Sequence, residues 1–125
     1  MPSLFRILCR FGALAAGIAL LAAAPAAPTG DPYDVYVLLP LSGSVSFYAT
    51  AQQQTFKAIE AEANRTGGIG GRPLHFVIQD DQSDPRVDVQ LASGIIAKNV
   101  PLILGPTYVA SCLSIAPLVR NGPVM

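Results

Sequence analysis

Two short loops in this sequence place hydroxyl-bearing side chains directly after apolar runs. The loops span residues 41–48 and 105–111, and their hydroxyl-bearing side chains include those of Ser42, Tyr48, Thr107, Tyr108 and Ser111. Each apolar run is typical of a buried strand, and the sequence after each loop has a helical pattern. In open parallel α/β sheets, ligands bind in the crevice outside the carboxyl ends of the strands. The two loops are therefore the candidate site for binding a small molecule.

Residues typical of an active site do not accompany these loops. The sequence has no Gly-x-Ser-x-Gly elbow and no phosphate-binding loop, and its single histidine, His75, falls inside a predicted strand. The glycine-rich run at residues 67–71 follows a helical pattern and precedes a strand, so it predicts a turn rather than a dinucleotide loop. We therefore expect a binding protein that is not an enzyme and needs no cofactor.

An acidic segment follows the second predicted strand. Asp84 stands directly before Pro85, which is typical of a helix start with a carboxylate cap and proline in the first turn. Asp80 and Asp81 precede it without a histidine or further carboxylate nearby. We interpret these aspartates as caps and turn formers, and we expect no metal site.

The elements that position the loops alternate between strand and helix. Strands are predicted at residues 35–39, 73–79 and 101–104. The first helix begins at Ser46 or Thr50 and runs to about Arg65, with Phe56, Ile59 and Ala63 as its apolar stripe. The second begins after Asp84, and the third spans about 110–121, with Pro117 as a kink or a late start.

The second predicted helix has the clearest apolar stripe. Its members recur at helical spacing and are Val87, Leu91, Ala92, Ile95 and Ile96. The alternating order predicts an α/β fold with a parallel sheet and right-handed crossovers. Residues 122–125 have the pattern of a strand entrance, where the sequence stops, so we expect a fragment of a larger domain.

The amino-terminal segment is typical of a secretory signal peptide. Arg6 and Arg10 precede an uncharged apolar run, and a small-residue site ends at Ala26. The alternative, a membrane anchor, is less favoured because the run is shorter than the roughly 20 residues that a spanning helix needs. We expect a signal peptide at 1–26, a linker at 27–33, a partial domain at 34–125 and a periplasmic location.

Composition excludes further classes of protein. Without Arg6 and Arg10, six basic residues face eight acidic ones, so no nucleic-acid partner is expected. Cys112 is the only cysteine outside the leader and has no partner for an internal disulfide.

Four motifs, in order and at matching spacing, resemble the periplasmic substrate-binding proteins of branched-chain amino-acid ABC transporters. They are Leu39-Pro40-Leu41-Ser42-Gly43 with Tyr48, Gly67-Gly68-Ile69-Gly70-Gly71-Arg72, Asp80-Asp81-Gln82-Ser83-Asp84-Pro85 and Leu104-Gly105-Pro106. The resemblance implies the type I periplasmic-binding-protein fold, in which two lobes enclose the ligand. This chain would form the first part of lobe one, with sheet order 2-1-3.

The resemblance also implies a ligand site. In the family, a ligand carboxylate meets hydroxyls and backbone N–H groups at the loop after the third strand. The family's usual serine falls at Val109, which offers only its backbone N–H, so Thr107, Tyr108 or Ser111 is a substitute. Tyr48, with Phe47, either stacks against an aromatic ligand or packs on the first helix.

The resemblance implies a solute-binding component of an ABC importer, with an amino acid or another small carboxylate as ligand and a membrane permease as partner. A ligand-sensing receptor or regulator of the same fold and a non-functional remnant are the alternatives.

Overall fold

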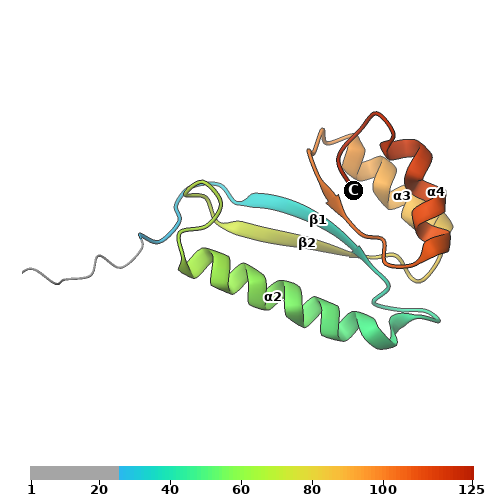
Figure 1. The fold of residues 1–125 in the computed structure, drawn as a ribbon, viewed down its shortest axis with the longest axis horizontal. Coiled ribbons are helices and arrows are strands. Elements are labelled where there is room, and N and C mark those ends of the chain that lie inside the picture. The colour runs from blue at the N-terminus through green and yellow to red at the C-terminus, as the bar shows by residue number, and fades with distance from the viewer. Residues whose placement is uncertain (1–25) are drawn as a thin grey trace, which may run out of the picture.

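The computed structural model describes residues 26–125, and residues 1–25, which hold nearly all of the predicted signal peptide, lie outside the described part. Strands and helices alternate along the described chain (Figure 1). Their order is β1 (Tyr33–Leu39), the short 3₁₀ helix η1 (Ser46–Tyr48), α2 (Ala49–Arg65), β2 (Leu74–Asp80), α3 (Pro85–Ile96), β3 (Ile103–Leu104) and α4 (Val109–Val119). The predicted α/β order is confirmed.

The strands form one parallel sheet in the order β2–β1–β3, so the first strand is central. β1 pairs with β2 along its whole length, and with β3 only through Tyr36 and Val37. The third strand is therefore shorter than the predicted 101–104. An isolated parallel bridge joins Leu102 to Val124, so the chain near residue 124 runs beside β3 as the predicted fourth strand would. The carboxyl ends of β1 and β3 consequently lie side by side.

Helices cover the two faces of the sheet unequally (Figure 1). On one face, α3 and α4 pack over the sheet and close a core that contains Tyr36, Leu38, Ile95, Ile103 and Ile115. On the other face, α2 is the only helix of the described residues, and there the rings of Phe56 and Phe76 meet edge to face at 4.9 Å. Residues 35–39 of β1 are all buried, as a central strand between two helical layers requires.

Only part of the predicted apolar stripe of α2 packs against the sheet. Phe56 packs on the sheet, but the Ile59 side chain is 48% exposed. Ile59 and Ala63 help to line a shallow hollow of about 540 Å³ on this helix. Among the described residues, the stripe is therefore not buried along its whole length, because no other described helix lies beside α2 on this face of the sheet.

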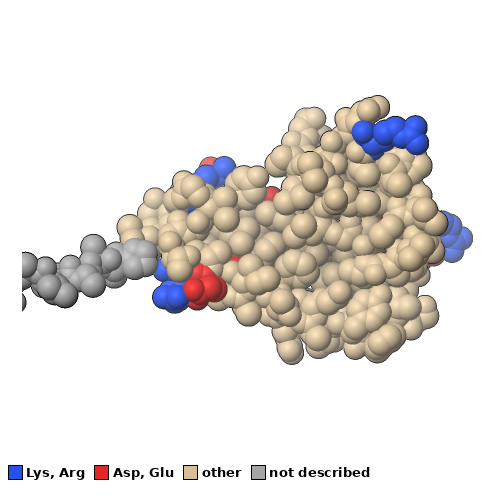
Figure 2. Space-filling view, in the orientation of Figure 1, with Lys and Arg blue, Asp and Glu red and all other residues tan. Residues whose placement is uncertain are grey.

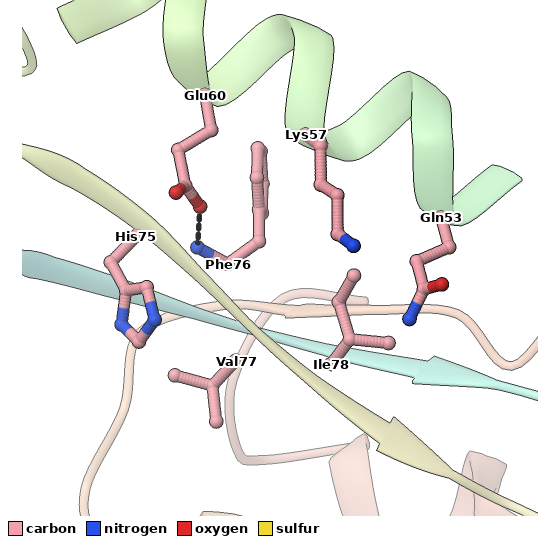
Figure 3. Close-up of a pocket in the computed structure, with 7 residues that line it drawn as sticks. All are labelled: Gln53, Lys57, Glu60, His75, Phe76, Val77 and Ile78. Atoms are coloured by element: carbon pink, nitrogen blue, oxygen red, sulfur yellow. Dashed lines mark hydrogen bonds between the residues drawn. The ribbon is translucent and has the colours of Figure 1, made fainter.

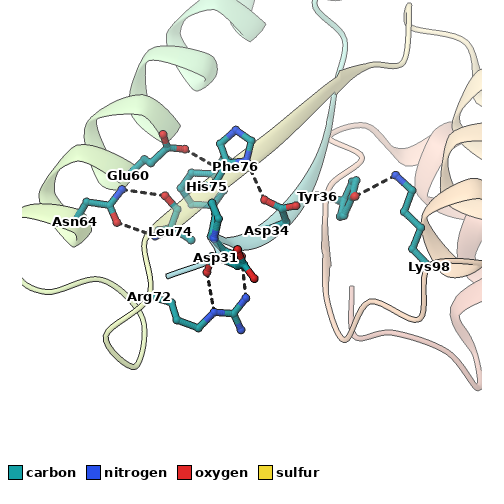
Figure 4. Close-up of polar contacts among 11 residues, drawn as sticks. Asp31, Asp34, Tyr36, Glu60, Asn64, Arg72, Leu74, His75, Phe76 and Lys98 are labelled. Atoms are coloured by element: carbon teal, nitrogen blue, oxygen red, sulfur yellow. Dashed lines mark hydrogen bonds and ion pairs between the residues drawn. The ribbon is translucent and has the colours of Figure 1, made fainter. Parts of the chain in front are cut away.

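Side chains of α2 instead protect the outer edge of β2 (Figure 4). The Asn64 side-chain amide accepts from Leu74 N–H at 2.7 Å and donates to Leu74 C=O at 2.9 Å. One turn earlier, the Glu60 carboxylate accepts from Phe76 N–H at 2.7 Å. An unpaired strand edge is a template for another strand. The two side chains therefore occupy backbone groups that an added strand would need.

A hollow of about 410 Å³ runs along the same edge (Figure 3). Lys57 and Gln53 continue the row on α2 beyond Glu60 and lie over Ile78 of β2. This hollow is at the outer edge of the sheet, away from the central strand.

The glycine-rich run at 67–71 forms the turn between α2 and β2, as predicted. Gly68 has φ +71°, and an added Cβ would overlap with Arg72 C=O. The Gly68 N–H donates to Ala63 C=O, which closes the end of the helix. The run follows a helix and begins a strand, so it does not have the geometry of a dinucleotide loop.

Candidate ligand-binding site

The two predicted loops meet at the carboxyl edge of the sheet. The Tyr48 hydroxyl, at the end of η1, lies 3.4 Å from the Thr107 hydroxyl in the loop after β3. The Tyr48 ring also meets the Phe47 ring edge to face, with centroids 4.9 Å apart. Phe47 is 83% exposed, so an aromatic surface stands beside the joined loops.

The first loop is held in place by the acidic segment after β2. The Asp80 carboxylate accepts from the Ser42 N–H at 3.0 Å and from the Ser42 hydroxyl at 2.7 Å. Ser83 makes two further hydrogen bonds to the same loop. Its hydroxyl donates to Ser42 C=O and accepts from Val45 N–H. Gly43 has φ +87°, and a Cβ there would overlap with Gln82 C=O. The Ser42 side chain therefore serves to hold the loop.

The aspartates act as the caps and turn formers that the sequence predicted. Asp84 precedes α3 and accepts from Arg86 N–H at 2.9 Å, and its pKa is lowered by its bonds to Arg86. Burial works to raise the pKa of Asp80, but hydrogen bonds from Ser42 and Gln82 outweigh it and hold the pKa below its usual value. Among residues 26–125, no cluster of three or more potential metal ligands is found.

The second loop ends at the amino terminus of α4. Gly105 has φ +87° and lies so close to β1 that a Cβ would overlap with Leu38 C=O. Tyr108 precedes the helix in an extended conformation and makes no side-chain cap. Its hydroxyl is buried and has no hydrogen-bond partner among the described residues. The first N–H groups of a helix have no partner within it, so those that begin at Val109 are available to an anion.

The remaining two predicted contacts lie in contrasting surroundings. Val109 is 74% exposed at the first position of α4 and presents its backbone N–H there. Ser111 is fully buried, and its hydroxyl donates to the Asp88 carboxylate of α3. The structure thus brings Tyr48 and Thr107 together and turns the Ser111 hydroxyl away from solvent, so this hydroxyl is not free for a ligand.

Several polar residues that support the site were not predicted to do so. Asp80 and Ser83 position the first loop, and Asp88 holds Ser111 in α4. Asp88 occupies the inward face of α3, seven positions before Ile95, where the helical period gives an apolar residue. An acidic residue within an otherwise apolar stripe was the feature of the sequence that could have identified Asp88 as a supporting residue.

The site offers hydroxyls, amide groups and aromatic surface, which suits binding of a small carboxylate.

His75 lies elsewhere, in β2, where its ring nitrogen is 2.9 Å from the carboxylate of its cross-strand neighbour Asp34 (Figure 4). Both side chains are about half exposed, and His75 lies within a strand, as the sequence predicts. Lys and Arg side chains on the face in Figure 2 lie in separate spots rather than in one continuous surface. Of the described helices, none combines the length and apolar character needed to cross a membrane.

Comparison with known proteins gives a family match over most of the chain. The model of the periplasmic binding protein family matches residues 32–125. A chemotactic signal transduction system substrate-binding protein from Halobacterium salinarum is 40% identical over 80 residues, which are 62% of this chain and 19% of that protein. The leucine-, isoleucine-, valine-, threonine- and alanine-binding protein of Pseudomonas aeruginosa is 30% identical over 97 residues, 77% of this chain and 26% of that protein.

Solved structures share the fold. A solute-binding protein of an ABC transporter from Rhodopseudomonas palustris, in complex with 3,4-dihydroxybenzoic acid, superposes with a TM-score of 0.63 at 20% identity, over 74% of this chain and 25% of that one. The chain thus spans about a quarter or less of the length of these proteins.

Proposed function

Because the chain belongs to the periplasmic binding protein family, we propose that residues 34–125 form one wall of the ligand cleft in an extracytoplasmic solute-binding protein of an ABC importer. A signal peptide at 1–26 and a linker at 27–33 would precede this part of lobe one and direct it to the periplasm. The contact between Tyr48 and Thr107 carries the proposal, because it joins the loops after β1 and β3 where an open α/β sheet binds ligands.

The proposed ligand is a small carboxylate with an apolar or aromatic body. The amino terminus of α4 favours an anion, and the proposed contacts there are Thr107, Tyr108 and the N–H of Val109. Phe47 and Tyr48 supply aromatic surface for the body of the ligand. Ser42 and Ser111 hold the loop and the helix rather than the ligand, because Asp80 and Asp88 already occupy their hydroxyls.

Both ligand classes have precedent among similar proteins. The Pseudomonas relative is named for branched-chain and other small amino acids, and the Rhodopseudomonas structure holds an aromatic acid. Valine at position 109 removes the hydroxyl that the family's usual serine would offer to an α-carboxylate. We therefore rank aromatic and other acids with the amino acids as candidates. The described loops place no general base beside these contacts, so the proposed role is binding without turnover.

The proposal is tested by amide chemical shifts of the ¹⁵N-labelled chain during titration with leucine or 3,4-dihydroxybenzoate. One wall of a cleft leaves a ligand partly solvated, so we expect binding in the millimolar range. Shift changes should concentrate at residues 46–48 and 107–111, with His75 and Val77 as unperturbed reference positions. Unchanged spectra, or changes confined to the edge of β2, would contradict the proposed site.

A sensory role for the same site is the second candidate. The Halobacterium relative is named as part of a chemotactic signal transduction system. Either role begins with ligand binding and differs in the membrane partner. Affinity capture from the membranes of the source organism should recover a permease under the first proposal and a signal transducer under the second.

A further inference from the structure

A buried polar contact joins α3 to α4 behind the candidate site. Asp88 in α3 and Ser111 in α4 are both 0% exposed. The Ser111 hydroxyl donates to one carboxylate oxygen of Asp88, and the other oxygen has no partner among residues 26–125. Ser111 is the third residue of α4, so the contact holds the first turn of that helix.

The charge of a second buried acid, Asp81, acts on this contact. Asp81, in the loop between β2 and α3, is also 0% exposed, and one of its carboxylate oxygens has no partner in the described part of the chain. The charged groups that act on Asp88 are Asp81 and Asp84, which are both acids. Within residues 26–125, no Lys, Arg or His pairs with Asp81 or Asp88, and Arg86 pairs with Asp84 instead.

Two buried carboxyl groups without a neighbouring cation are energetically unfavourable when both are ionised. Burial raises the pKa of Asp88 to about 6; the Ser111 hydrogen bond opposes this rise, and the charges of Asp81 and Asp84 add to it. Burial also raises the pKa of Asp81. The hydrogen bond from Ser83 N–H lowers this pKa, and the charge of Asp80 raises it further. The charge of Asp81 acts on Asp88, so ionisation of one acid makes ionisation of the other less favourable.

We propose that Asp81, Asp88 and Ser111 form a proton-dependent contact between α3 and α4, complete when the two carboxyl groups hold one proton taken up from solvent. With that proton, a single negative charge is buried and Ser111 still donates to Asp88. When the proton leaves, two buried like charges without a cation repel each other, and this repulsion weakens the packing of α3 against α4. Under the proposed function, the same event would also loosen the ligand loop at residues 105–108.

The direction of the pH effect follows from proton uptake. Asp88 has a higher pKa in the folded chain than the ordinary value near 3.9 of the unfolded chain. At a pH between these two pKa values, the chain therefore takes up a proton when it folds. The contact therefore stabilises the fold fully below pH 4, and this contribution is lost as pH rises through about 6.

Urea unfolding of the whole chain at pH 5 and pH 7.5 tests the proposal without any ligand. For a folded pKa of about 6, the unfolding equilibrium constant of the natural chain should be about tenfold larger at pH 7.5 than at pH 5. Asp88→Asn keeps the shape of the side chain but cannot ionise, so most of this difference should disappear. Asp31→Asn, at an exposed site, is the control and should retain it. His75 is present in all three chains and cancels in the comparison.

Carbon-13 NMR of the aspartate carboxyl groups gives a second readout on the natural chain. One carboxyl among Asp81 and Asp88 should titrate near pH 6 rather than near pH 4. Ser111→Ala removes a bond that favours the charged form, so it should move that titration to higher pH. Titration of all aspartates below pH 5, or an Asp88→Asn chain with the pH dependence of the natural one, would overturn the proposal. Because neither experiment uses a ligand, the result is independent of the proposed function.

Discussion

The hydroxyl of Tyr48 lies 3.4 Å from that of Thr107, which is 59 residues further along the chain. The two residues belong to the loops after β1 and β3, the adjacent strands whose carboxyl ends form one edge of the sheet. Their contact links the aromatic surface of Phe47 and Tyr48 to the amino terminus of α4. Substitutions can test this contact, the groups around it and the backbone geometry that supports them.

Tyr48→Phe should weaken ligand binding more than it weakens the fold. The change removes one long hydrogen bond to a partly exposed hydroxyl, so the free energy of unfolding should fall by no more than about 1 kcal/mol. The midpoint of the leucine or 3,4-dihydroxybenzoate titration should rise several-fold, because the two loops lose their direct link. Tyr33→Phe, at the amino end of β1, is the matched control and should leave the midpoint unchanged. Equal midpoints for the two variants would assign Tyr48 to packing alone.

Val109→Ser should increase affinity for amino acids. The side chain at this position is 74% exposed, so the fold should tolerate the change with little effect on stability. The new hydroxyl would stand at the first position of α4, beside the N–H groups that face an anion. Leu113→Ser, one turn further and 70% exposed, provides the control for a new surface hydroxyl. Leucine titrations of both variants should show tighter binding only for Val109→Ser.

Gly105→Ala should strongly destabilise the chain. The positive φ of this residue costs a non-glycine residue about 1–3 kcal/mol, and the overlap of a Cβ with Leu38 C=O adds to that cost. Gly70→Ala separates the two contributions, because Gly70 has φ +60° but no atom within 4 Å of an added Cβ. It should destabilise the chain less than Gly105→Ala does.

A third alanine variant should change the free energy of unfolding in the opposite direction. Gly94 lies in α3 with open space around an added Cβ, so Gly94→Ala should stabilise the chain by about 0.5–1 kcal/mol. Urea unfolding of the three variants should therefore rank their stabilities in the order Gly94→Ala, Gly70→Ala, Gly105→Ala. A Gly105→Ala chain as stable as Gly70→Ala would show that the loop after β3 can move away from β1.

Asn64→Ala should expose the outer edge of β2. The change leaves the N–H and C=O of Leu74 without partners, which costs about 1–3 kcal/mol for partly buried groups. Glu60→Ala should have a similar effect at Phe76 N–H. Both variants should also self-associate at lower protein concentration than the natural chain, as measured by light scattering, because their strand edge is open to a second strand.

Glu62→Ala is the control for these edge variants. Glu62 lies on the same helix but pairs with Arg65 at the exposed surface. Exposed ion pairs contribute little, so its stability and light scattering should match those of the natural chain. Self-association of Glu62→Ala to the same degree as Asn64→Ala would contradict the edge explanation.

The order of the elements and the places of the loops could be predicted from the amino-acid sequence. Apolar runs, helical periods, the Asp84-Pro85 cap and the glycine-rich turn are local signals, because each depends on residues close together in the chain. The aspartates after β2 were interpreted correctly as caps and turn formers for the same reason.

Which side chains meet and which face solvent depends on the three-dimensional packing and could not be predicted from local patterns. Ile59 fits the apolar stripe of α2 but is half exposed, because the stripe does not show which helices share a face of the sheet. Ser111 was expected near the ligand, whereas its hydroxyl is bonded to Asp88 on another helix. The link between Tyr48 and Thr107 likewise depends on the β2–β1–β3 strand order. These contacts join residues far apart in the chain, so no local pattern specifies them.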